Sequence, residues 1–272
     1  MIGKTEKSVT NRFSLARLAY RRRNVEFAHA AHTHEHLEQS LREDGTRSLH
    51  LADAVLGATD GIITTFAIVA GAAGARLSPG IVLIMGFANL LADGLSMAIG
   101  NYLGARSQQE YWQVERAREI WEIEQIPDAE RDEIRRIYRR KGFEGEMLED
   151  IVRTITADKE RWVEEMMREE LGIQEERINP LMSGTITFAA FALAGVLPVF
   201  PYVLAFFNSA LIESSFIQSI GITAMALFSV GVARRFMTRR PWWQSGLEFL
   251  GIGGLAAACA FFVGYTLRGL IG

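Results

Sequence analysis

The charged residues of this chain are segregated along the sequence, and this feature most constrains the fold. Of its 61 Asp, Glu, Lys and Arg residues, 35 fall within 106–179, whereas 181–233 contains one, Glu213. A surface helix of a soluble protein keeps a polar face, which spreads charge along the whole chain. The segregation therefore excludes an ordinary soluble enzyme and predicts membrane-spanning segments joined to one polar insert.

Five apolar segments are each long enough to cross a hydrocarbon core of about 30 Å as a helix. They cover residues 51–74, 80–105, 181–204, 210–233 and 244–267. A turn at 197–201 is expected to end the third. Because no water satisfies an open backbone inside a bilayer, the segments must be helical. The predicted fold class is an all-α membrane protein of five transmembrane helices, with a helical insert between the second and third.

The chain is expected to divide into four parts. These are a polar tail (1–48), helices one and two (49–105), the insert (106–179) and helices three to five (180–272). Within the insert we expect at least three short helices, the first continuing out of the second span. Pro127 and Gly142 are the predicted breaks and Gly172 the predicted stop.

The distribution of basic residues predicts the topology. Arginines are concentrated in 12–23 and in the loop 234–240, whereas the opposite loops hold one basic residue, Arg76. With five spans, the tail, the insert and the 234–240 loop lie on one side, which the bias assigns to the cytoplasm. The tail is either a basic helix on the membrane surface or a solvated segment. Its His32 and His36 have the spacing of a metal-binding pair on a helix, but the interpretation that we prefer for them is a flexible tail.

Two pairs of glutamates in the insert have helical spacing. Glu119 and Glu122 are three residues apart, and Glu130 and Glu133 repeat that spacing after Pro127. Each pair shares a helix face, so two helices could converge on divalent cations. The alternative is a solvated face, because an insert this rich in acids produces such spacings by chance.

Two methionines precede a further glutamate near the end of the insert. Met166 and Met167 lie four and three residues before Glu170. Oxygen ligands alone suit Mg²⁺, Ca²⁺ or Mn²⁺, and added thioether sulfur favours a softer transition metal such as Fe²⁺. The two side chains could equally fill a hydrophobic core.

Acidic residues also occur inside the first two apolar segments. Asp60 lies in the first, and Asn89, Asp93 and Met97 follow each other at four-residue intervals in the second. A carboxylate at the bilayer centre costs roughly 3 kcal/mol and is retained mainly for function. These residues could line one polar pathway, or they could form a structural hydrogen-bonded pair between helices.

Several other classes of protein find no support in the sequence. The single cysteine, Cys259, excludes an internal disulfide framework and any cysteine-cluster metal site. There is no nucleophile–base arrangement, phosphate-binding loop or dinucleotide motif, and the formal net charge of −3 gives no reason to expect a nucleic-acid partner. Glycines recur along the first two segments, which permits close helix packing.

The sequence resembles the vacuolar iron transporter family. The resemblance is carried by the runs DAVLGATDGIITTFAIVAGAAGA, LLADGLSMAIGNYL, WVEEMMREELGI and LPVFPYVL, which occur in the expected order between residues 49 and 268. It implies a five-span homodimer that exports Fe²⁺, and often Mn²⁺, from the cytosol in exchange for protons. The membrane would be the plasma membrane of a prokaryote, or a vacuolar-type membrane in a eukaryote.

The resemblance also implies roles for individual residues. The metal ligands of the cytoplasmic insert would be Glu119, Glu122, Glu130, Glu133, Met166, Met167 and Glu170. Asp60 and Met97 would line the transport pathway, and Asp53 matches an acid common in the family. Asn89 departs from the pattern, because the family usually has a glutamate there; Asp93, one turn away, would then supply the carboxylate.

A second function remains open at this point. The insert could bind iron in a membrane-anchored sensor or store whose spans serve only as an anchor. Asp60, Asp93 and Met97 favour transport, because an anchor has no need for polar side chains at membrane depth.

Overall fold

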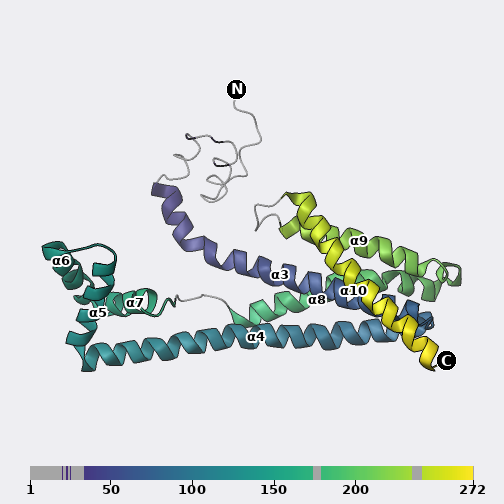
Figure 1. Ribbon diagram of the computed structural model, residues 1–272, viewed down its shortest axis with the longest axis horizontal. Coiled ribbons are helices and arrows are strands. Elements are labelled where there is room, and N and C mark those ends of the chain that lie inside the picture. The colour runs from purple at the N-terminus through teal and green to yellow at the C-terminus, as the bar shows by residue number, and fades with distance from the viewer. Residues whose placement is uncertain are drawn as a thin grey trace. The chain divides into compact units, whose positions relative to one another are not determined.

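The computed structural model describes residues 20, 23, 25, 34–173, 179–234 and 241–271, and its regular elements there are all helical. The helices are α3 (His34–Gly74), α4 (Pro79–Gln125), α5 (Pro127–Arg140), α6 (Gly145–Thr156), α7 (Lys159–Glu169), α8 (Pro180–Phe207), the short 3₁₀ helix η2 (Ser209–Leu211), α9 (Ser215–Ala233) and α10 (Trp242–Ile271) (Figure 1). Most of the 12–23 segment, His32 and the loop residues 235–240 lie outside this part of the chain.

Among the described residues, five helices are long and apolar enough to cross a membrane, which confirms the predicted all-α class with five spans. They are α3 from His50 onward, α4, α8, α9 and α10. Helix α4 has 47 residues, a length of about 70 Å. This exceeds twice the thickness of a hydrocarbon core. The charged residues after 105 therefore extend beyond the apolar part of the same helix, as predicted for the first insert helix.

The chain forms two compact units, and the first comprises Met1–Gly94 and Ile186–Gly272. Within it, α10 packs against α3 and α9, and α3 packs against α9. Glycine allows α3 to approach α8 closely. A Cβ at Gly61 would lie 2.3 Å from the carbonyl oxygen of Phe191, so no larger residue fits unless the helices separate.

The third span does not end at the predicted turn. Helix α8 continues through Pro198 and Pro201 to Phe207, so the expectation of a turn at 197–201 was wrong. Each proline removes one backbone donor, so the carbonyls of Ala194 and Leu197, four residues earlier, lose their helical partner. A separate contact joins α8 to α9 nearby, where the buried Ser219 hydroxyl donates to the Pro198 carbonyl at 2.6 Å.

The second unit, Leu95–Thr185, contains the polar insert. Pro127 begins α5, where its missing N–H costs nothing, and Asp128 and Glu130 lie in the first turn. Gly142 and Gly172 have φ values of +96° and +66°, in the left-handed region that glycine tolerates. The predicted breaks at Pro127 and Gly142 and the stop at Gly172 are confirmed.

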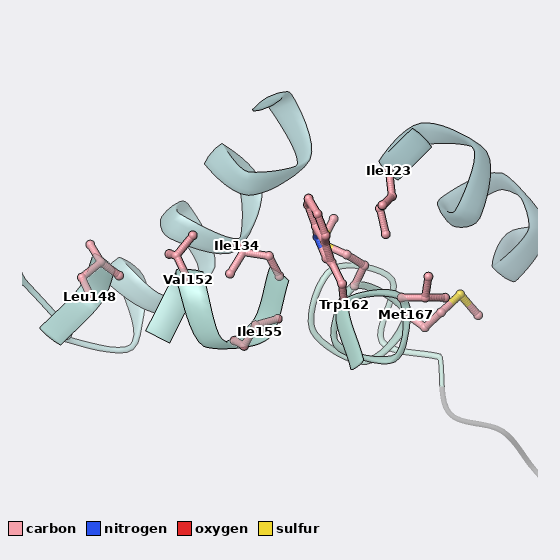
Figure 2. Close-up of a cluster of buried hydrophobic side chains, with 9 residues drawn as sticks. Ile123, Ile134, Leu148, Val152, Ile155, Trp162 and Met167 are labelled. Atoms are coloured by element: carbon pink, nitrogen blue, oxygen red, sulfur yellow. The ribbon is translucent and has the colours of Figure 1, made fainter. Parts of the chain in front are cut away.

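The insert has a hydrophobic core of its own (Figure 2). Each helix contributes a stripe at helical spacing, as Leu148, Val152 and Ile155 do on α6. The core residues are Ile123, Ile134, Leu148, Val152, Ile155, Trp162, Val163, Met166 and Met167. Tyr138 of α5 adds a polar link, because its hydroxyl donates to the buried Glu165 carboxylate of α7 at 2.6 Å.

Candidate functional site

Two glutamates of the insert are buried although a carboxylate normally stays in water. Glu119 of α4 is 0% exposed and Glu130 of α5 is 4% exposed. Neither carboxylate oxygen of Glu119 has a hydrogen-bond donor among the described residues, and the same holds for Oε2 of Glu130. Burying a charge without hydrogen bonds is costly, so these carboxylates require a proton or a nearby cation.

Three further glutamates surround this pair. Glu122 and Glu133 are half-buried on α4 and α5, and Glu170 is exposed at the end of α7. The charges of the five carboxylates act on one another across the three helices. The structure thus brings together all five glutamates that the sequence analysis selected, which we call the acidic cluster.

Burial and mutual repulsion alter the protonation of this cluster. Burial, followed by the charge of Glu170, raises the pKa of Glu119 to about 7. Burial, followed by the charge of Glu133, raises the pKa of Glu130 to about 7 as well. Both groups can therefore exchange a proton for a metal cation near neutral pH.

A basic residue that the sequence analysis did not select lies beside this cluster. The guanidinium of Arg118 donates from Nε to Glu115 Oε2 at 2.9 Å and from Nη1 to Glu122 Oε2 at 2.8 Å. Its Nη2 lies 2.9 Å from Glu119 Oε1, although the angle is not that of a hydrogen bond. The i,i+3 and i,i+4 spacings to Glu115 and Glu122 were a signal that could have identified Arg118.

The two methionines occupy the hydrophobic core of the insert. Met166 is 0% exposed and Met167 is 3% exposed, and Met167 lies near Trp162 and Ile123 in Figure 2. These positions agree with the packing alternative. A role as metal ligands stays a prediction that requires the side chains to turn toward the acidic cluster.

Within the described part of the chain, no three acidic, histidine or cysteine side chains are close enough together to hold a metal ion as they stand. Two carboxylates of the acidic cluster, those of Glu119 and Glu122, instead pair with Arg118. Metal binding at these residues therefore requires side-chain movement, which the exposed positions of Glu170 and Arg118 permit.

The first unit brings membrane-depth polar residues of α3 and α4 together. The carboxylate of Asp93 on α4 is close enough to that of Asp60 on α3 for their charges to interact. One turn before Asp93, Asn89 donates through Nδ2 to Thr64 Oγ1 at 3.4 Å. The Thr64 hydroxyl in turn donates to the Asp60 carbonyl at 2.9 Å. Thr64, which the sequence analysis did not select, thus links Asn89 to the backbone at Asp60.

Two other predicted pathway residues lie on the same two helices. Asp53 lies two turns before Asp60 on α3, with its carboxylate 3.8 Å from Nδ1 of the neighbouring His50. Met97 follows Asp93 by four residues on α4 and is half-buried. It belongs to the second compact unit.

Five apolar helices, acids at membrane depth and a polar helical unit with buried carboxylates define an integral membrane protein. A comparison with protein families identifies the family to which this membrane protein belongs. The family model described as the VIT family matches residues 51–265, and the chain belongs to this family. The family comprises transporters and not enzymes.

Similar proteins from three organisms are named as iron transporters. A vacuolar iron transporter of Toxoplasma gondii is 35% identical, over 94% of this chain and 89% of its own length. That of Plasmodium berghei is 33% identical, over 93% and 95%. Vacuolar iron transporter 1 of Arabidopsis thaliana is 33% identical, over 77% and 82%. The similarity thus extends over most of each chain, in both protist and plant relatives.

Proposed function

We propose that this protein transports iron across a membrane, exporting Fe²⁺ and also Mn²⁺ from the cytosol in exchange for protons. Family membership and the names of its relatives support iron as the cargo. The observation that carries the transport mechanism is the pair formed by Asp60 and Asp93, two carboxylates on different helices at membrane depth. A carboxylate there is expensive unless it binds a cation or a proton.

The proposed cycle uses the acidic cluster first and the membrane acids second. The cluster collects divalent ions from the aqueous side, because carboxylates bind these ions and both oxygens of Glu119 and Oε2 of Glu130 lack hydrogen-bond donors. The metal then passes along α4 to Met97, Asp93 and Asp60. After releasing the metal, the same carboxylate would accept a proton and carry this proton back toward the cytosol. This exchange would couple metal export to proton entry.

Topology and location are part of the same proposal. The arginine bias supports a cytoplasmic N-terminus and a cytoplasmic insert. The names of the relatives favour a vacuolar-type membrane if the chain is eukaryotic, and the plasma membrane remains our proposal for a prokaryote. A homodimer is proposed from the family resemblance.

The test is metal flux into proteoliposomes that contain the purified protein. We expect Fe²⁺ and Mn²⁺ uptake that increases with an imposed pH gradient and is absent from protein-free vesicles. Metal binding to the protein without any flux would instead identify a membrane-anchored sensor or store. Cross-linking in the same vesicles tests the dimer.

A further inference from the structure

The guanidinium of Arg118 lies where a metal cation would bind to the acidic cluster. Its three nitrogens contact three different carboxylates, those of Glu115, Glu119 and Glu122. Its positive charge also acts on Glu130 and Glu170. One guanidinium therefore compensates the charge of carboxylates from α4, α5 and α7.

We propose that Arg118 is a built-in competitor for the transported metal, which occupies the acidic cluster in the metal-free protein and must leave when a divalent cation binds. The inference rests on the metal-binding role proposed above and adds a residue that sets the affinity. Arg118 contacts Oε1 of Glu119 and Oε2 of Glu122, and these are oxygens that a metal held by both residues would use. Arginine and metal cannot occupy the same oxygens together.

The surroundings of Arg118 allow this exchange. The side chain is 40% exposed, so it can move into water without opening the hydrophobic core. Ion pairs at such exposure are weak, and a divalent ion can displace them. Glu115, which is outside the predicted set of ligands, provides a second partner that can retain the guanidinium nearby.

The consequence of the competition is a lower affinity and a faster release. Without an internal cation, five carboxylates with two buried members would bind a divalent ion tightly. A transporter must release its cargo toward the pathway, so a collecting site that binds too tightly would slow transport. Arg118 would counter this by re-entering the acidic cluster as the metal leaves.

The experiment measures Mn²⁺ binding to the full-length protein in detergent by titration calorimetry and its release by stopped flow. The variant is Arg118→Gln. The control is Arg116→Gln, which makes the same charge change two residues away on α4, where the partner is Glu160. We expect Arg118→Gln to bind Mn²⁺ about tenfold more tightly through slower release, whereas Arg116→Gln stays within about twofold of wild type.

The outcomes separate this inference from the proposed function. If wild type binds Mn²⁺ but Arg118→Gln and Arg116→Gln have equal affinities, the competition is refuted and the metal site stands. If wild type binds no Mn²⁺, both proposals fail. If Arg118→Gln does not fold, Arg118→Lys replaces it. We expect this variant to bind Mn²⁺ about threefold more tightly than wild type, because a lysine cannot contact three carboxylates with one planar group. An Mn²⁺ affinity equal to that of wild type would refute the competition.

Discussion

Asn89 of α4 donates a hydrogen bond to the hydroxyl of Thr64 on α3, and that hydroxyl donates to the backbone carbonyl of Asp60. The Asn89 amide is thus linked through Thr64 to the backbone at Asp60, and it contributes no titratable group. Asp93, one turn further along α4, is the carboxylate that interacts with Asp60. Asp60 and Asp93 are the two acids of this group, whereas Asn89 and Thr64 are uncharged.

Replacing Asp60 or Met97 with alanine should reduce Fe²⁺ flux at least about tenfold while the protein still folds. Each change removes a potential metal ligand at membrane depth, and a loss of about 1.4 kcal/mol in binding corresponds to tenfold. Flux in proteoliposomes is the measurement, with Met225→Ala as the control, because Met225 of α9 is exposed. Wild-type flux in both variants would refute the pathway assignment.

Replacing Asp93 with asparagine should preserve some metal binding but make flux independent of the pH gradient. An amide cannot take up the proton that the exchange requires. Asn89→Glu in the same background should restore the dependence, because it places a carboxylate on the same face one turn away. Proton-dependent flux in Asp93→Asn that equals wild type would leave Asp60 as the proton carrier and Asp93 as a structural residue.

The acidic cluster should supply most of the metal affinity of the full-length protein. Changing Glu119, Glu122, Glu130 and Glu133 together to glutamine should abolish most Mn²⁺ binding at pH 7.5. Binding to wild type should weaken as the pH falls below about 7, where Glu119 and Glu130 become protonated. The control makes the same charge change at exposed glutamates of the insert, namely Glu124, Glu144, Glu146 and Glu164. An unchanged stoichiometry in the first variant would contradict the assignment.

The metal-free insert should lose stability as the pH rises. The pKa values of Glu119 and Glu130 are about 7 in the folded protein and 4.5 for an ordinary glutamate. Between these two pH values the folded state therefore binds more protons than the unfolded state. The contribution of these two protonated glutamates to the free energy of unfolding is complete below pH 4.5 and is lost as the pH rises through 7.

Hydrogen exchange of the full-length protein measures this effect in peptides derived from the insert. Wild type and variant are compared at the same pH, and the rates are corrected for the pH dependence of intrinsic exchange. A variant with Glu119→Gln and Glu130→Gln cannot ionise at either site, so its protection should change less between pH 5 and 8. Mn²⁺ should restore protection to wild type at pH 8, because the cation favours the charged carboxylates. Parallel profiles for the two proteins without metal would show that these glutamates do not control stability.

The hydrogen bond between Tyr138 and Glu165 should stabilise the insert. Tyr138→Phe removes a donor to a buried carboxylate, which should cost about 2 kcal/mol. Local opening measured by hydrogen exchange in α5 and α7 tests this. Tyr111→Phe makes the same chemical change at an exposed residue and should have almost no effect.

Several features of this protein follow from the sequence alone, because they depend on local composition. Apolar runs between charged segments determine the five spans, since a bilayer tolerates few other structures. Pro127 and Gly142 divide the insert through their own backbone preferences. The four-residue intervals that place Asn89, Asp93 and Met97 on one face follow from helix geometry.

Other features were decided by the tertiary structure, because they depend on which helices meet. The sequence placed Glu119 and Glu130 on their helices, but the burial of both side chains depends on the packing of the insert. Helix α8 continues through Pro198 and Pro201, and the contact of Ser219 on α9 with the Pro198 carbonyl depends on how these two helices pack. No local pattern specifies that Asp93 approaches Asp60, since a helical period fixes the face of one helix and not the partner that this face meets.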